Sequence, residues 1–274
     1  MKRRIISLML LLLACLMLFS ACSLFGGVDE KKIVTYLTSV GSDFEKSKES
    51  LKVFDENISK DLAGITKALD IVKKSKSDFQ SRMDSASKQV VPNKPEELAG
   101  FHNSLIQYYS YSVELMGEYE QILNYSQVLI KSISPMEKAV NTDLGKAPSM
   151  EEVKAMVKAL KTSINESITI AKGFTPPQYM ADSHGNYLTI LTNFGSATDD
   201  FIYALQLEDP LRINATSYRY ELLANKLSNI GDEMSKDIEN QQVQMKDLGN
   251  KLQKSQDDLY RQLLLWQGQY KIGS

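Results

Sequence analysis

The sequence predicts an all-α protein, an elongated bundle of about five long helices. Apolar residues recur at three- and four-residue spacing from residue 29 almost to the C-terminus, which is the period of a helix with one buried face. Proline, glycine and capping residues fall where one apolar stripe ends and the next begins. No segment alternates polar and apolar residues for long enough to indicate a strand.

The first predicted element begins with Asp29 as its N-cap residue. Its apolar stripe extends from Leu37 to Val90 and indicates either one long helix or two helices broken near Gly64. Prolines at positions 92 and 95 end this element, because proline cannot continue a helix.

The second element opens at Glu96 and Glu97, where carboxylates suit the positive end of the helix dipole. The Ser134-Pro135 pair is expected to kink this helix, and Gly145 is expected to close it. Its length would then approach fifty residues.

Three further elements follow. The run 149–152, Ser-Met-Glu-Glu, has the pattern of a capping box and opens a helix that closes at Gly173. A fourth helix is predicted to start at residues 175–177, Thr-Pro-Pro. The fifth starts at the Asp209-Pro210 pair and continues for nearly sixty residues without a proline, which corresponds to about 90 Å of helix.

A weak internal repeat links two of these elements at an offset of 82 residues. Residues 95–106 align with residues 177–188, and their Pro, Ala and His are identical. Both histidines of the chain, His102 and His184, lie on this repeat, and each copy opens a helix that follows another helix. The pattern therefore predicts a duplicated helical hairpin.

The N-terminal segment has the features of an export signal. Three basic residues at positions 2–4 precede an uncharged apolar run from Ile5 to about Phe19, which ends at Ser20-Ala21-Cys22. A run of about fifteen apolar residues is short for a helix that spans a bilayer, which needs about 20. Cleavage is favoured, and an uncleaved anchor is the alternative.

Residues 19–22, Phe-Ser-Ala-Cys, resemble the lipobox of bacterial lipoproteins. The resemblance implies that Cys22 carries a lipid such as palmitate and becomes the first mature residue. The third position before the cysteine is usually Leu in that family and is Phe19 here, whereas Leu12-Leu13-Ala14-Cys15 matches better locally. Cleavage at Cys15 would leave a very short apolar run, so Cys22 is favoured over Cys15.

The expected organisation is therefore a signal peptide at 1–21, a lipidated tether at 22–28, and a single helical ectodomain at 29–274. The chain would be tied to the outer face of the cell membrane. Arginine is scarce against lysine, six to 26, which favours a low-GC, Gram-positive source. The body is also loosely similar, by architecture alone, to helical lipoproteins of Gram-positive bacteria described as cell-wall-binding.

Composition excludes several classes of function. Both cysteines lie in the first 22 residues, so the body can hold no disulfide, thiol nucleophile or thiolate metal site. Removal of residues 1–21 takes away three of 32 basic residues and none of 34 acidic ones, which leaves a formal charge of −5. A nucleic-acid partner would require the opposite sign.

The two histidines of the chain are a candidate site. His102 and His184 would form a metal-binding or pH-sensing pair if the duplicated hairpins brought them together. A di-iron bundle needs Glu three residues before each histidine, and Ala99 and Ala181 occupy those positions, so structural packing is favoured and no metal or cofactor is predicted.

Aromatic and basic residues offer weaker candidates. A tyrosine cluster could stack on a glycan or could divide between core and rim; it comprises Tyr108, Tyr109, Tyr111, Tyr119 and Tyr125. The lysine-rich stretches 46–48 and 73–76 are solvated helix faces or contacts to anionic lipid or teichoic polymer.

The sequence contains no phosphate-binding glycine loop, no Gly-x-Ser-x-Gly and no His-Glu-x-x-His, so we expect a non-enzymatic binding or scaffolding lipoprotein. Its partner would be a cell-wall polymer or a surface protein, and the stripe of the fifth helix leaves self-association as a coiled coil open. Two alternatives stay open. One is a pore-forming or membrane-remodelling component, although no apolar run after residue 22 approaches the required length. The other is a histidine-dependent metal or pH sensor.

Overall fold

The computed structural model describes residues 29–51, 61–140 and 149–272, and these form six α-helices and one 3-10 turn without a strand. The all-α prediction is confirmed. In chain order the elements are α2 (Glu30–Leu51), α3 (Leu62–Lys88), α4 (Glu97–Val140), α5 (Met150–Lys172), η2 (Gln178–Met180), α6 (Ala181–Leu207) and α7 (Pro210–Tyr270).

The first predicted element is two helices, which is why the bundle has six helices and not five. The Asp61 side chain caps α3 by accepting a hydrogen bond of 2.8 Å from the Gly64 backbone N–H. Gly64 therefore lies in the first turn of α3, which begins directly after the extended residue Asp61.

Most of the predicted helix ends are confirmed. Ser149 and Glu152 form the reciprocal capping box of α5, and Gly173 is its C-cap residue. Asp209 caps α7, with Pro210 in its first turn. The fourth predicted helix starts slightly later than expected, since η2 intervenes before α6.

The second predicted helix, α4, continues through Pro135 to Val140. Its predicted end at Gly145 lies outside the described residues.

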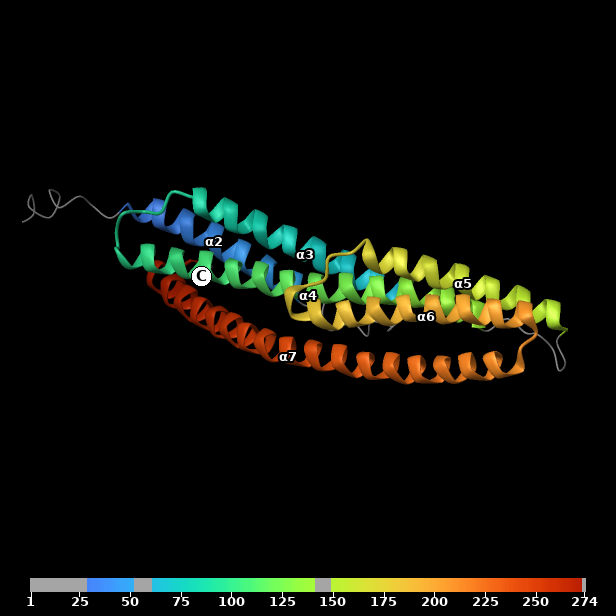
Figure 1. Ribbon diagram of the computed structural model, residues 1–274. Coiled ribbons are helices and arrows are strands. Elements are labelled where there is room, and N and C mark those ends of the chain that lie inside the picture. The colour runs from blue at the N-terminus through green and yellow to red at the C-terminus, as the bar shows by residue number, and fades with distance from the viewer. Residues whose placement is uncertain (1–28, 52–60, 141–148, 273–274) are drawn as a thin grey trace, which may run out of the picture.

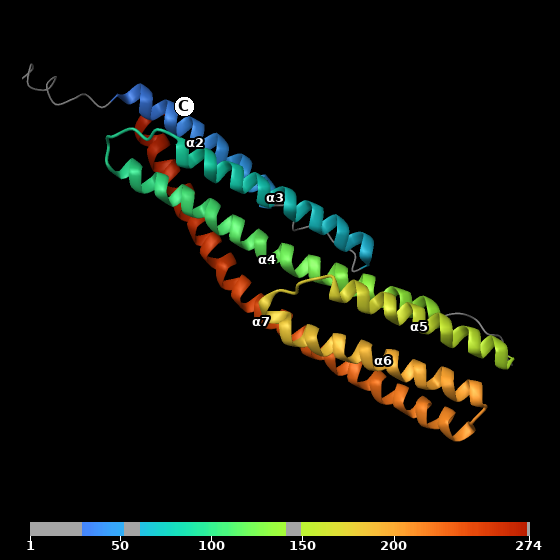
Figure 2. The same cartoon turned by 45° about the horizontal axis from the view of Figure 1, so that its top comes forward.

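The helices form an elongated bundle in which successive helices run in opposite directions (Figure 1). At one end α2 and α3 lie beside the first half of α4, and at the other end α5 and α6 lie beside its second half, as Figure 2 also shows. The 61 residues of α7 correspond to about 90 Å and run back along both halves. Each half is thus a four-helix arrangement that shares α4 and α7 with the other.

Each half has its own core of buried side chains. The first core joins α2, α3, the start of α4 and the end of α7, and its largest members are Ile33, Leu37, Phe44, Phe79, Leu98, Leu105, Tyr108, Tyr109, Met116, Leu259 and Leu263. The second core comprises Tyr125, Ala171, Met180, Tyr187, Ile190, Leu191, Ile230 and Met234. Full burial of one large apolar side chain contributes about 1.5–3 kcal/mol, so packing within each half is the main source of stability.

The start of α2 and the end of α7 lie at the same end of the bundle. A Cβ on Gly41 would contact Leu263, and Ile272, just after α7, packs against the first core. A tether that precedes residue 29 would therefore attach at this end. Within the described residues, no helix combines the length and apolar character that crossing a membrane requires.

Candidate functional site

A polar groove of about 650 Å³ lies between α2 and α3. α3 packs mainly on α4 and has few contacts with α2, and the groove between α2 and α3 is open to solvent. The polar groove is lined by Ser39, Val40, Ser42, Asp43, Lys46, Asp78, Ser81, Arg82, Ser85, Ala86, Lys88, Gln89 and Leu105. Hydroxyl and charged groups therefore dominate its walls.

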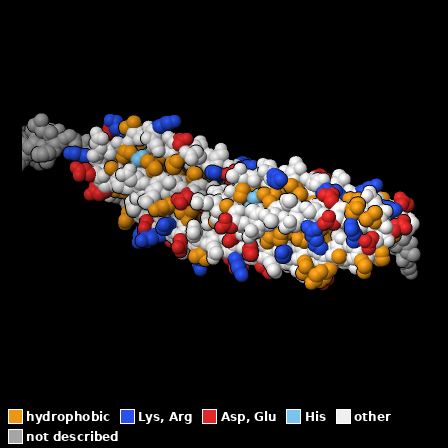
Figure 3. All heavy atoms as spheres, viewed as in Figure 1, with side chains coloured by type: hydrophobic (Ala, Val, Ile, Leu, Met, Phe, Trp, Pro, Cys, Tyr) orange, Lys and Arg blue, Asp and Glu red, His pale blue; other side chains and the backbone are white. Residues whose placement is uncertain are grey.

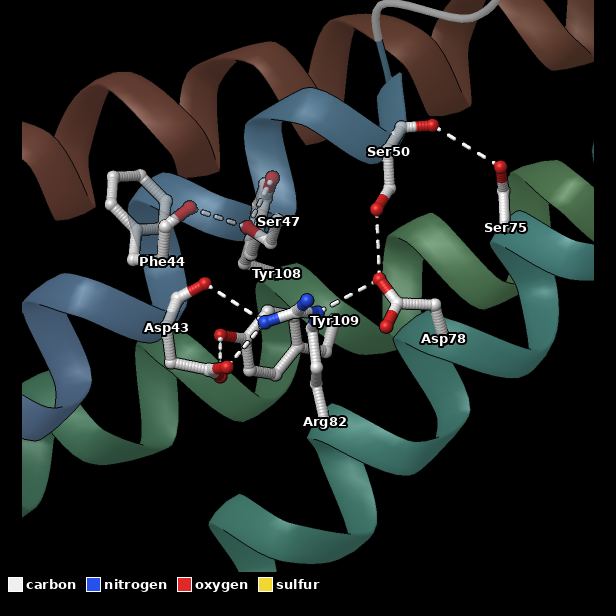
Figure 4. A network of polar contacts seen from close by, with 9 residues as sticks. All are labelled: Asp43, Phe44, Ser47, Ser50, Ser75, Asp78, Arg82, Tyr108 and Tyr109. Carbon is white, nitrogen blue, oxygen red and sulfur yellow. Dashed lines mark hydrogen bonds and ion pairs between the residues drawn. The ribbon is translucent and has the colours of Figure 1, made fainter.

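Arg82 is the central group of this groove (Figure 4). Its guanidinium forms an ion pair with the Asp43 carboxylate on α2 and donates a hydrogen bond of 2.9 Å from Nε to Asp78 Oδ2, one turn earlier on α3. The same guanidinium donates to the Asp43 backbone carbonyl at 3.1 Å. Arg82 thus fixes the spacing of α2 and α3 with charge-assisted hydrogen bonds.

The carboxylates of Asp43 and Asp78 also accept hydrogen bonds from hydroxyl groups. The Tyr109 hydroxyl on α4 donates to Asp43 Oδ2 at 2.6 Å, and the Ser50 hydroxyl donates to Asp78 Oδ2 at 2.8 Å. Burial opposes ionisation of Asp78, but the hydrogen bonds from Arg82 and Ser50 prevail and lower its pKa. Burial and the neighbouring Asp43 raise the pKa of Tyr109, so its hydroxyl stays protonated as a donor.

Aromatic side chains support this network from beneath. Phe79 on α3 is fully buried and lies edge-on to Tyr108, with 6.3 Å between the ring centroids, and at 6.4 Å from Tyr109. Tyr108 also contacts Phe44 of α2 in a T-shaped arrangement. The polar network therefore lies directly on the first core, which makes it rigid.

A second groove of about 520 Å³ adjoins the first along α2, because both are lined by Ser39 and Gln89. It continues toward the start of α2, and its charged lining residues are Asp29, Lys31 and Lys32. Together the two grooves are lined by five cationic side chains and three carboxylates, a net charge of +2. The mature chain as a whole is predicted to carry −5, so this surface is positive against an acidic background.

The predicted histidines are buried, with only 6% of His102 and 4% of His184 exposed. The Tyr36 hydroxyl of α2 lies 2.9 Å from His102 Nδ1, and the Tyr125 hydroxyl of α4 lies 3.2 Å from His184 Nδ1. In each case a histidine near the start of one helix pairs with a tyrosine on the preceding parallel helix. The two halves of the bundle thus repeat one arrangement.

The structure does not bring the two histidines together. Tyr125, the partner of His184, lies 23 positions after His102 on α4, which corresponds to about 35 Å along the helix. Figure 3 shows the few visible histidine atoms, in pale blue, at two separate places along the bundle. In the described part of the chain, no cluster of three or more His, Cys, Asp or Glu side chains is placed to hold a metal ion.

Both imidazoles favour the neutral state. Burial lowers the pKa of His102 and of His184 below the ordinary value, and the backbone carbonyls of Ala86 and Ala171 oppose that shift only in part. His184 Nε2 makes no hydrogen bond of normal geometry within the described residues, although the Ala171 carbonyl is close enough to favour the protonated ring.

This burial predicts a pH-dependent stability. Because the pKa of each histidine is lower in the folded than in the unfolded chain, the unfolded chain binds more protons below about pH 6.5, and the free energy of unfolding should fall as pH drops from 7.5 to 5.5. His102 and His184 are the only histidines in the chain. Urea unfolding at both pH values should show a smaller difference for the double variant His102→Gln/His184→Gln. An unchanged difference would contradict this origin.

The tyrosines predicted as a candidate site differ in how deeply they are buried. Tyr108, Tyr109 and Tyr125 are buried core residues, whereas Tyr111 and Tyr119 are half-buried, so the tyrosine cluster divides between core and rim. Cys22 and Cys15 lie outside the described residues.

The sequence prediction missed Arg82, which is one of only four arginines after residue 22 and lies one turn after Asp78. The scarcity of arginine in the helical body was a signal that could have singled out Arg82.

Comparisons of the chain with protein-family models, with curated proteins and with solved structures found no match. The grooves and the two tyrosine–histidine pairs are therefore the features from which the function of this chain has to be inferred.

Proposed function

We propose that this chain is a membrane-anchored lipoprotein that binds an acidic, hydroxyl-rich polymer of the cell envelope in the grooves along α2. It acts outside the cytoplasmic membrane, and by binding rather than by catalysis. The observation that carries the proposal is the net positive charge of the grooves on an otherwise acidic chain. A cationic surface of this kind selects an anionic ligand and speeds its association.

The lining of the polar groove suits a phosphate-bearing sugar or polyol chain. Lys46 and Lys88 are exposed and form no ion pair with another described residue, so their ammonium groups are free to meet phosphate. Four exposed serine hydroxyls, at positions 39, 42, 81 and 85, can donate to and accept from ligand hydroxyls. Arg82 is already paired with the carboxylates of Asp43 and Asp78. Its role is therefore structural, because it fixes the spacing of the two helices that form the groove.

The position of the grooves supports an extended ligand near the membrane. They follow one another along α2 up to Asp29, which is the end where the predicted tether of residues 22–28 would attach. A tether of about six residues spans at most roughly 20 Å when extended. The grooves would therefore stay close to the outer face of the cytoplasmic membrane, where membrane-linked polymers are concentrated.

The test is co-sedimentation of the mature body, residues 23–274, with purified sacculi that retain their anionic polymers. We expect binding that weakens as salt is raised. The variant Lys46→Glu/Lys88→Glu should bind about tenfold more weakly, or roughly 1.4 kcal/mol, since each reversed lysine at an exposed site accounts for about 0.5–1 kcal/mol.

The matched control is Lys236→Glu/Lys251→Glu, which makes the same change of charge at exposed positions of α7. It should bind like the parent chain. Equal loss in both variants would mean that net charge, and not the groove, controls binding. No binding at any salt concentration, or undiminished binding to sacculi stripped of anionic polymer, would refute the proposed ligand.

A further inference from the structure

The first turns of α7 expose an apolar stripe that the bundle does not use. Leu211 is 79% exposed, Tyr218 is 62% exposed and Leu222 is 44% exposed, and the small residue Ala215 lies exposed between them. Their spacing of four, three and four residues places all of them on one edge of the helix. We call these four residues the α7 seam.

The α7 seam is separate from the face by which α7 packs into the protein. That inward face consists of Thr216, Leu223, Ile230 and Met234, which are buried. Beyond Leu222 the seam edge becomes polar, with exposed Asn225 and Asn229 at the next positions. The apolar stretch is therefore confined to one end of α7, where Figure 3 shows apolar side chains gathered along the lower edge. Internal packing does not explain it.

We propose that the α7 seam pairs with the α7 seam of a second copy of this chain, with the two helices parallel and related by a twofold axis. Four-three-four spacing is that of the contact positions of a coiled coil. In a parallel pair, Glu221 on one flank of the seam lies opposite Lys226 on the other flank of the second copy, five residues further along. Both are exposed, and their charges are complementary.

The charges disfavour the antiparallel arrangement. Arg212, Arg219 and Lys226 occupy one flank of the α7 seam, and an antiparallel twofold axis would place this flank against itself. Cations would then face cations across the contact. Asp200 and Asp209 pair with two of these arginines within the same chain, but Lys226 forms no ion pair with another described residue. The Glu221–Lys226 match exists only in the parallel pair.

Neighbouring residues enlarge the contact. Tyr203 and Leu207 on α6 are each about half exposed, and the Arg212 guanidinium lies 5.5 Å from the centroid of the Tyr203 ring. Tyrosine and arginine are the residue types enriched at the centres of protein interfaces. The contact surface thus extends from α7 onto the end of α6.

The length of the α7 seam sets the strength of the pairing. From Leu211 to Leu222 the helix rises about 17 Å, which is fewer than two heptads. Such a seam associates weakly in solution. Anchoring both copies in one membrane, which rests on the function proposed above, would orient them in parallel and raise their effective concentration. The pairing itself requires only the α7 seam.

Cysteines introduced into the helical body provide the test, since the chain has no cysteine of its own after residue 22. Full chains with Ala215→Cys, Leu222→Cys or Ser217→Cys are oxidised in membranes and, as purified protein in detergent at about 100 µM, analysed on non-reducing gels. A parallel pair brings both seam positions opposite their own copies, so Ala215→Cys and Leu222→Cys should each form several-fold more dimer than Ser217→Cys, which is exposed but turned away from the seam.

An antiparallel pair allows at most one of the two seam cysteines to meet its own copy, so cross-linking of only one overturns the proposal, as does cross-linking of neither.

Charge exchange gives a second readout in the Ala215→Cys background. Glu221→Lys should reduce the dimer several-fold, and Glu221→Lys/Lys226→Glu should restore it; failure to restore it would overturn the pairing. Membrane fractionation of the same samples reports separately on the anchor, so a chain that dimerises in detergent but is not anchored would refute only the proposed anchoring.

Discussion

The Cys22→Ala variant is expected to lose all incorporation of labelled palmitate. The resemblance to the lipobox implies that the lipid is carried by a cysteine sulfur, and Cys15 is the one other cysteine in the chain. The predicted signal peptide ends at residue 21, so the mature parent chain should begin at Cys22 with the lipid attached. Alanine at that position removes the attachment atom without adding bulk. The expected effect is therefore all or none.

The measurement is metabolic labelling with palmitate, followed by mass spectrometry of the N-terminal peptide of the parent chain. The matched control is Cys15→Ala, which should leave labelling unchanged, because residue 15 lies within the predicted signal peptide. Retained label in Cys22→Ala together with lost label in Cys15→Ala would reverse the assignment. Loss in neither variant would refute a lipid anchor on cysteine.

Replacing Phe79 by alanine should lower the free energy of unfolding by about 3–5 kcal/mol. Phe79 is fully buried where α2, α3 and α4 meet, and its ring contacts both Tyr108 and Tyr109. Its removal leaves a cavity that three packed helices cannot close without moving. Because Tyr109 holds Asp43, and Asp43 holds Arg82, the same cavity should also weaken binding in the polar groove.

Urea unfolding followed by circular dichroism at 222 nm measures the change in stability. Val243→Ala is the matched control, because Val243 is 63% exposed on α7 and should change the free energy of unfolding by less than about 0.5 kcal/mol. A loss below about 1 kcal/mol for Phe79→Ala would show that the junction repacks readily. It would also contradict the view that the polar network rests on a rigid core.

Short-range sequence patterns were sufficient to predict most of the helices of this fold. The pairs Asp209-Pro210 and Ser149-Glu152 act within one turn of a helix, so their capping roles followed from neighbouring residues and are confirmed. The alternative of two helices broken near Gly64 is the correct one, but Gly64 itself lies in the first turn of α3 and does not interrupt a helix. Capping by Asp61 distinguishes the two cases.

The candidate sites depended on contacts that no local pattern contains. The repeat at an offset of 82 residues aligned His102 with His184, yet their partners Tyr36 and Tyr125 are 89 positions apart, so the equivalence of the two pairs was not visible in one alignment. The ion pair between Arg82 and Asp43 likewise joins residues 39 positions apart on different helices.

The sequence by itself determined the helical class and most helix ends, because each follows from residues within a few turns of one another, whereas the lipid anchor stays a prediction. Only the tertiary structure decided that the bundle has two cores, that the histidines lie in separate halves, and that a positive groove opens between α2 and α3. It also decided that the α7 seam is exposed rather than buried. The physical reason is that an apolar stripe specifies a face to be covered but not which helix covers it, and that choice is made by the packing of the whole chain.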